Sequence, residues 1–386
     1  ADQRRLAAEG VALVSSRPDT AALLAVEAGR RGQLPETDGA LAAALLRFPA
    51  IVRHLSAGEQ ILERPVTSPD RRVLAAVSGT SIEVFATASG TPVRRIDAGA
   101  EISTLAFVSD TVLAVATATE VGLWDTASGA SVGASIAISS ATSIAASPDG
   151  SRLAIGADDA TMRVINLQGR VVAAPVTVGS GPVTAIAWHP DGVHVIAGTG
   201  FPTEPTVGTS TVELWDTTSR TLTLEVVITG LAVQEVAVDS TGQRALVASA
   251  APGAVTLIDL DTGASVELND GRQPLATSST FLPDDPAAFL DASGGIVRYA
   301  THGELDQPID NVPGTANATA PIGLPVETPT TSDGRLAPGP DDTVFVTASS
   351  GGIVQVALDG GGALFQLVAD ESIDDVGAFA PGGSQV

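Results

Sequence analysis

The spacing of apolar residues along the chain changes near residue 50. Before it, alanines, leucines and valines recur every three to four residues, which is the pattern of amphipathic helices. Asp19 or Thr20 is expected to cap the second of these helices, Gly32 to end it, and Pro49 to follow the third. The pattern predicts a linker of two to three short antiparallel helices over residues 1–50.

After residue 50, apolar and polar residues alternate with the two-residue period of β-strands. The stretches "EVGLWDTASG" and "VELWDTTS" are the clearest copies of a segment that recurs at intervals of about 40 residues. Two longer intervals contain insertions at residues 201–210 and at about 303–331. The copies align, as the third strand of each unit, on Phe85, Trp124, Ile165, Trp215, Ile258, Tyr299 and Ala357.

A turn pattern follows the same repeat. About twenty residues before most of these positions lies a turn such as "SPDGSR" at 147–152 or "HPDGVH" at 189–194. Proline restricts φ, aspartate bonds to nearby backbone N–H groups and glycine accepts a positive φ, so these residues favour a tight hairpin. Four antiparallel strands in about 40 residues are one propeller blade. We therefore predict an all-β, seven-bladed β-propeller over residues 51–386.

The motifs Trp124-Asp125, Trp215-Asp216 and Ile258-Asp259, together with the S-P-D-G turns, resemble the bacterial WD-repeat β-propellers. The Gly-His pair of that family is missing, because the corresponding stretches read "DAGAEIS", "ISSATS" and "GSGPVT". The repeats are therefore degenerate, and the His–Ser/Thr–Asp–Trp hydrogen-bond network of the family is not expected here. Blade rigidity is expected to come from alanine and valine packing and from backbone hydrogen bonds.

The same resemblance gives a role to both ends of the propeller. In that family an N-terminal strand completes the last blade, and residues 51–58, "IVRHLSAG", have the pattern of such a strand. Residues 374–386 resemble the first strand and turn of an eighth unit. The sequence leaves open whether further blades follow.

Charge and composition exclude several functions. The net charge is −24, and all 20 basic residues are arginine. This balance argues against binding of nucleic acid or of anionic lipid, both of which need concentrated positive charge. There is no cysteine, so disulfides and thiolate chemistry are excluded. No stretch approaches twenty consecutive apolar residues, so no membrane insertion is expected within this chain.

The individual chemical motifs have structural explanations. Trp124 and Trp215 are expected to pack between blades, and Asp125 and Asp216 to accept turn N–H groups. His189 and His194 flank a turn and offer only Asp191 as a third metal ligand, so a turn surface is preferred to a metal site. The acidic runs lack the alternation of a Ca²⁺ loop, and the glycine-rich runs precede strands rather than helices. We expect no catalytic residue, cofactor or metal.

Functional residues are expected where the repeat is interrupted. The candidate partner-binding loops contain Phe201, Thr203, Glu204, Asp306, Asp310, Asn317 and Glu327. The main hypothesis is a non-catalytic protein-interaction or sensor propeller. The alternatives are a propeller enzyme of the lactonase or hydrolase type and a sensor of a sugar or peptide ligand. A bound divalent ion, or three or more ionisable groups converging on the central channel, would argue against a scaffold.

The N-terminal segment provides a second resemblance. "ADQRRLAAEGVALVSSRPDTAALLAVEAGR" and "ALAAALLRFPAIVRHL" are similar to the helical linker that precedes WD repeats in STAND-type signalling ATPases and BTAD transcription regulators. The resemblance implies an ATPase, and any DNA-binding part, upstream of Ala1. It also implies a bacterial protein that is tethered to the membrane by an upstream segment and is extracytoplasmic, with a cytoplasmic location as the alternative. Partners would be other proteins or the upstream domains of the same chain.

Overall fold

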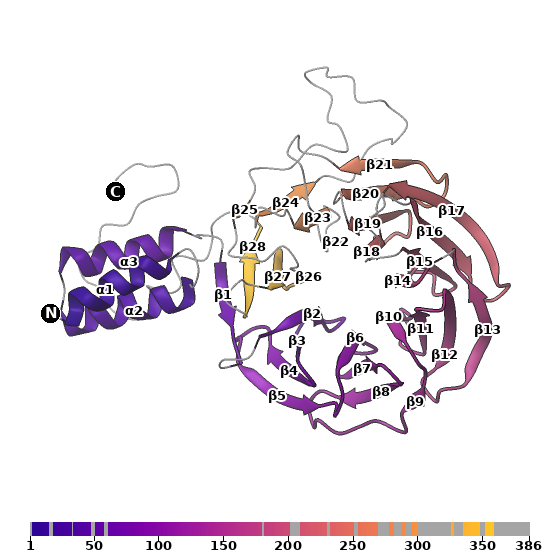
Figure 1. The fold of residues 1–386 in the computed structure, drawn as a ribbon, viewed down its shortest axis with the longest axis horizontal. Helices are drawn as coiled ribbons and strands as arrows, with labels where there is room; N and C mark the ends of the chain where they lie inside the picture. The colour runs from indigo at the N-terminus through magenta and orange to yellow at the C-terminus, as the bar shows by residue number, and fades with distance from the viewer. Residues whose placement is uncertain are drawn as a thin grey trace, which may run out of the picture.

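The chain folds into a ring of small β-sheets with three helices beside it (Figure 1). The computed structural model describes residues 2–14, 18–32, 34–47, 51–57, 61–179, 181–200, 209–229, 232–250, 254–268, 278–281, 287–290, 295–299, 326–327, 335–347 and 352–358. The helices lie next to the part of the ring that contains β1 and β28, where the two ends of the propeller sequence meet.

The helices are α1 (Asp2–Leu13), α2 (Pro18–Arg31) and α3 (Pro35–Arg47). They pack through Leu6 and four alanines, whose small side chains allow close approach. The predicted cap at Asp19 or Thr20 is wrong, because α2 begins at Pro18, and proline suits the first helical position, where no N–H is needed. The predicted end at Gly32 is confirmed.

The described strands form seven four-stranded antiparallel sheets. Six of these sheets consist of four strands that are consecutive in sequence. The first three are β2 (Glu63–Thr67), β3 (Val73–Ser78), β4 (Ser81–Ala86) and β5 (Pro92–Asp97); β6 (Ile102–Phe107), β7 (Val112–Thr117), β8 (Glu120–Asp125) and β9 (Ile136–Ala137); and β10 (Ala141–Ala146), β11 (Arg152–Ala157), β12 (Thr161–Asn166) and β13 (Val171–Thr177).

The other three consecutive sheets continue the ring. They are β14 (Val183–Trp188), β15 (His194–Thr199), β16 (Thr209–Asp216) and β17 (Thr221–Thr229); β18 (Ala232–Val238), β19 (Arg244–Ala250), β20 (Ala254–Asp259) and β21 (Ser265–Leu268); and β22 (Ser279–Phe281), β23 (Ala287–Leu290), β24 (Gly295–Tyr299) and β25 (Val326–Glu327). The first strand of each sheet lies nearest the ring axis and the fourth lies at the rim (Figure 1).

The remaining sheet joins the two ends of the propeller sequence. It contains β26 (Leu336–Pro338), β27 (Thr343–Thr347), β28 (Ile353–Ala357) and, as its outer strand, β1 (Ile51–Leu55). β1 pairs antiparallel with β28, with Leu55 opposite Ile353. The prediction that residues 51–58 complete the last blade is thereby confirmed. The eighth unit suggested at 374–386 lies outside the described residues.

The core lies between neighbouring sheets. The second strands carry small apolar side chains with almost no exposed area, including Ala75, Ala114 and Ala154. Clusters of buried residues bridge successive sheets, as when Val84 and Ile96 of one sheet meet Leu105 and other residues of the next. The expected alanine and valine packing is therefore observed, and it is possible because small side chains let two twisted sheets approach closely.

The S-P-D-G turns connect first and second strands, as predicted. In the turn between β10 and β11, the Ser147 hydroxyl donates to Asp149 Oδ1 at 2.6 Å, and the Ser151 N–H donates to the same oxygen at 3.0 Å. Gly150 has a φ of 66°, where a side chain would be strained. The ionised carboxylate of Asp149 is thus the centre of the turn.

The substitution Asp149→Asn is expected to make the melting temperature less sensitive to acid. Hydrogen bonds from Ser147 and Ser151 lower the pKa of Asp149 from 3.8 to about 2. Because the folded-state pKa is the lower one, the stabilisation is present above about pH 3.8 and is lost as the pH falls towards 2. Melting curves over this range should show a smaller loss for the variant, and the exposed Asp158→Asn is the control. A variant that loses stability in acid as steeply as the parent would contradict this role.

Candidate ligand-binding cavity in the propeller channel

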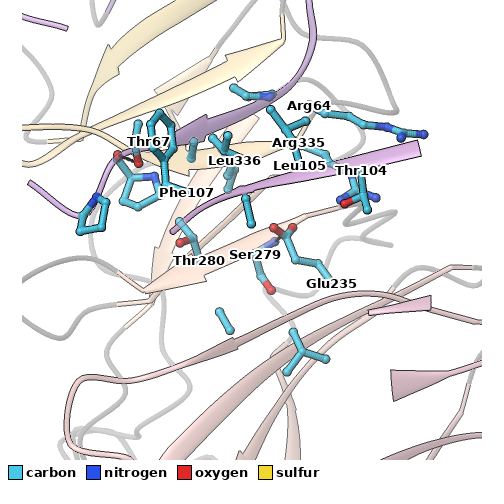
Figure 2. Close-up of a pocket in the computed structure, with 18 residues that line it drawn as sticks. Arg64, Thr67, Thr104, Leu105, Phe107, Glu235, Ser279, Thr280, Arg335 and Leu336 are labelled. Atoms are coloured by element: carbon cyan, nitrogen blue, oxygen red, sulfur yellow. Dashed lines mark hydrogen bonds between the residues drawn. The ribbon is translucent and has the colours of Figure 1, made fainter. Parts of the chain in front are cut away.

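A cavity of about 360 Å³ lies among the first strands of five sheets (Figure 2). Its walls come from β2, β6, β18, β22 and β26, the strands nearest the ring axis, and we call it the channel cavity. Leu105 and Phe107 form an apolar wall, whereas Arg64, Glu235 and Arg335 provide charged side chains. A volume of this size is in the range of small-ligand sites.

Arg64 is positioned by an irregularity in β2. The pairing register with β3 shifts between Glu63 and Val66, and Arg64 within this bulge has a φ of 49°. A positive φ is strained for a residue with a side chain, and bulges often redirect side chains next to functional sites. The Arg64 guanidinium donates to the carbonyl oxygen of Ser103 on β6. Burial, and then the nearby positive charge of Arg335, lower the pKa of Arg64.

Glu235 is placed by a similar bulge in β18, where the register with β19 shifts between Val233 and Glu235. Its Oε2 accepts the Ser278 hydroxyl and, at 3.2 Å, the Ser279 N–H. The Ser278 hydroxyl oxygen in turn accepts the Leu336 N–H at 2.8 Å. These bonds connect three sheets around the axis. Burial raises the pKa of Glu235, and Arg335 and the hydrogen bonds offset this only in part.

One polar group in the cavity wall is left unpaired. The side chain of Ser279 is fully buried, and its hydroxyl has no hydrogen-bond partner among the described residues. A buried hydroxyl without a partner costs about 1–3 kcal/mol. Figure 2 shows Ser279 beside Glu235 and below Arg335. The cavity therefore combines the hydrogen-bonded carboxyl group of Glu235 and the Ser279 hydroxyl with two guanidinium groups, and these two positive charges suit a ligand bearing an acidic group.

Sequence reasoning missed Arg64, Glu235 and Arg335. They are 100 to 271 residues apart, and no local motif connects them. The pairing shifts that position Arg64 and Glu235 become visible only when the strand partners are known. Three ionisable groups thus line the channel cavity, which is the number given above as an argument against a scaffold. Arg64 and Glu235 are, however, both held by backbone groups of neighbouring strands.

The residues aligned from sequence all lie in the third strand of a sheet. These are Phe85 in β4, Trp124 in β8, Ile165 in β12, Trp215 in β16, Ile258 in β20, Tyr299 in β24 and Ala357 in β28. They are spread around the ring and form no common site.

The aspartates that end three of these strands organise turns. Asp125 Oδ1 accepts the Ser128 N–H at 2.7 Å, Asp216 Oδ1 accepts the Thr218 N–H at 2.7 Å, and Asp259 Oδ1 accepts the Thr262 N–H at 2.8 Å. The prediction that Asp125 and Asp216 bind turn N–H groups is confirmed.

Most candidate partner-binding residues lie outside the described part of the chain. This applies to Phe201, Thr203, Glu204, Asp306, Asp310 and Asn317. Glu327 was assigned to a loop, but its backbone lies in β25 and pairs with Gly295 of β24. Glu327 thus belongs to the fourth strand that completes this sheet, within the segment at about 303–331 that the sequence assigned to an insertion.

Sequence reasoning overlooked the stretch "GASVG" at residues 129–133. It matches the G-x-S-x-G spacing of a nucleophile elbow, which requires a strand, a sharp turn and a helix. Here Ser131 is exposed, pairs in an isolated bridge with Trp124, and is followed by β9. The context of an elbow is absent at this position.

No helix in the described residues combines the length and the apolar character that crossing a bilayer requires.

Comparisons with known proteins agree with the fold. Residues 136–166 and 174–216 match the family described as "WD domain, G-beta repeat". No curated protein matches the chain in sequence. A chain in the "Crystal Structure of Mitotic Checkpoint Complex" is similar in structure, with a TM-score of 0.64 and 14% identity over 80% of this chain and 95% of that chain. Since 1650 chains of solved structures match, the fold alone does not select a function. The chain thus contains WD40 repeats and adopts a β-propeller fold.

Proposed function

We propose that this chain is the protein-interaction propeller of a larger bacterial signalling or transcription-regulatory protein. Residues 1–50 form its helical linker, and residues 51–386 form a propeller whose seven sheets are seven blades. The resemblance of the linker to that of STAND-type and BTAD proteins supports this context, with tethering to the membrane by an upstream segment. The match of residues 136–166 and 174–216 to the WD40 repeat supports the role of a protein-interaction scaffold.

The observation that carries the proposal is the pair of guanidinium groups at the channel cavity. In a chain of net charge −24, an acidic partner is repelled over most of the surface. Arg64 and Arg335 both line the cavity, although their like charges oppose each other. A carboxylate placed between them would relieve this repulsion and accept charge-assisted hydrogen bonds. We therefore assign the cavity to an Asp or Glu side chain of a protein partner.

The position of these arginines also indicates the docking face. Arg64 lies at the start of β2, and Arg335 immediately precedes β26. Because neighbouring strands alternate in direction, the ends of β15 and β16 that flank residues 201–208 lie on this same face. The predicted partner-binding residues Phe201, Thr203 and Glu204 thus belong to a segment that starts and ends on the face of the ring where the two arginines lie.

The hydrolase alternative has less support. Glu235 is held by two serines, and its partner Ser278 also accepts a backbone N–H. A nucleophile needs an adjacent base that is free to take its proton. His189 and His194, the histidines of the β14–β15 turn, do not line the cavity. The arrangement favours binding of an acidic group over covalent chemistry.

The experiment is a fluorescence anisotropy titration with acidic hexapeptides and their Asn/Gln counterparts. We expect the acidic peptides to bind more tightly, and Arg335→Ala to weaken that binding at least about tenfold through loss of a charge-assisted bond. Arg335 is exposed, so its removal should leave the fold intact. Arg170→Ala removes an exposed arginine elsewhere and is the control. Equal binding of the neutral peptides, or no effect of Arg335→Ala, would refute the proposal.

The second candidate is a small-ligand sensor, which the size of the channel cavity favours. In the same titration a free dicarboxylate would then displace the peptide and raise the melting temperature of the chain by itself. If peptides bind and free dicarboxylates do neither, the protein-interaction function is retained and the sensor is excluded.

A further inference from the structure

The turn between β14 and β15 brings two of the four histidines of the chain together with an aspartate. His189, Asp191 and His194 each offer one ligand atom, and these atoms lie within 4.8 Å of one another. We propose that this turn binds a divalent transition-metal ion, with Zn²⁺ as the metal to be tested. The proposal is independent of the channel cavity, whose lining contains none of the three residues.

Equivalent turns show that the histidines are not needed to form the hairpin. At the positions of His189 and His194, the turn between β10 and β11 has Ser147 and Arg152. There the Ser147 hydroxyl donates to Asp149 and accepts the Arg152 N–H at 2.9 Å. The turn between β2 and β3 uses Ser68 in the same way. Formation of the turn therefore does not explain why two imidazoles replace these residues.

The hydrogen bonds of His189 direct a lone pair towards Asp191. His189 Nε2 lies 2.8 Å from the carbonyl oxygen of Gly242 in the next sheet. A carbonyl oxygen only accepts, so Nε2 carries the proton and, in the neutral ring, Nδ1 carries the lone pair. Nδ1 accepts the Asp191 N–H at 3.2 Å, a bond that a metal ion on Nδ1 would replace, and it lies 3.1 Å from Asp191 Oδ1. Two electron-rich atoms at this distance are stabilised by a cation.

The distances suit a small metal ion. Metal–ligand bonds of about 2.0–2.1 Å at tetrahedral angles place ligand atoms about 3.3 Å apart. His194 Nδ1 donates its N–H to Asp191 Oδ2 at 2.6 Å, so this proton must leave Nδ1 and the ring must move slightly outward to complete the set. The bond from His189 Nε2 to Gly242 is the type of outer contact that orients a metal-bound histidine.

The three side chains are only partly exposed, at 18% for His189, 36% for Asp191 and 28% for His194. This exposure gives an ion a route from solvent. It also leaves room for a water molecule as the fourth ligand, which is common when three protein ligands are present. Imidazole and carboxylate donors together favour Zn²⁺ over Ca²⁺ or Mg²⁺, which prefer oxygen ligands.

The test is isothermal titration of the full chain with ZnCl₂. We expect one saturable site, and at least about a hundredfold weaker binding for His189→Ser/His194→Arg, since two of three ligands are removed. This double variant introduces the residues of the 147–152 turn and should therefore fold. His54→Ser, in β1, is the control and should bind as the parent does.

Histidine NMR provides a second measurement. The chain has four histidines, so a ring-proton correlation spectrum should contain four sets of signals, and Zn²⁺ should shift those of His189 and His194. The ¹⁵N shifts should identify Nδ1 of His189 as the bound atom. Absence of saturable heat, undiminished binding by the double variant, or shifts confined to the other two histidines would overturn the proposal.

Discussion

Replacing Phe85 by alanine is expected to lower the free energy of unfolding by about 3–5 kcal/mol. Phe85 has no exposed area and belongs to a cluster that also contains Leu55, Phe345 and Ile353. These residues come from the start and the end of the propeller sequence, because β1 and β28 share a sheet beside β2–β5. The substitution would leave a cavity at the seam where the ring closes, so both the transfer term and the cavity term contribute.

Urea unfolding followed by circular dichroism measures this loss. The control is Val93→Ala in β5 of the same sheet, where the side chain is 50% exposed and its removal should change stability by less than about 0.5 kcal/mol. Leu55→Ala should also destabilise the chain, by about 2–5 kcal/mol. A Phe85→Ala variant no less stable than Val93→Ala would show that the seam does not limit the stability of the ring.

The second large effect is expected at Trp188. Replacing Trp188 by alanine should cost about 3–5 kcal/mol, and replacing Trp124 by alanine should cost less. Trp188 is 7% exposed and packs with residues of β11 and β12 in the preceding sheet. Its Nε1–H donates to the Ala145 carbonyl oxygen of β10 at 3.0 Å, and the Arg152 guanidinium lies 4.9 Å from the ring centroid. One side chain thus links two neighbouring sheets by packing, by a hydrogen bond and by a cation–π contact.

Trp188→Phe separates these contributions. This substitution retains most of the apolar contact and removes the hydrogen bond. It should therefore lower the free energy of unfolding by about 1 kcal/mol beyond the loss that the smaller ring causes through packing. The same urea experiment compares all three variants. If Trp124→Ala lowered the free energy of unfolding as much as Trp188→Ala, the exposure of the two side chains would not predict their contributions to stability.

The repeat could be read from sequence because it depends on local chemistry. Alternating apolar residues, proline and glycine at turns, and the Asp at the end of the third strand act over a few residues. The hydrogen bonds of Asp125, Asp149 and Asp216 agree with this interpretation. The helix starting at Pro18 shows the limit, because several nearby residues could begin a helix and the start lies at the proline, which needs no N–H there.

The candidate sites could not be read in the same way. Arg64 and Glu235 owe their positions to shifts in strand pairing, which depend on partners far away in sequence. Trp188 carries no motif, yet it is more deeply buried than Trp124 or Trp215, which were conspicuous because of the following Asp. His189 and His194 were visible, but the orientation that Gly242 imposes on His189 comes from the next sheet.

The resemblance to WD-repeat propellers implied that residues 51–58 complete the last sheet, which is a non-local pairing of β1 with β28. The sequence by itself determined the repeating unit, its turns and the linker helices. Each of these follows from interactions between residues close in sequence or from the two-residue period of a strand. Only the tertiary structure decided which side chains meet at the channel cavity and at the β14–β15 turn. The physical reason is that neighbouring sheets are joined through non-local packing and hydrogen bonds, and these contacts have no periodic signature along the chain.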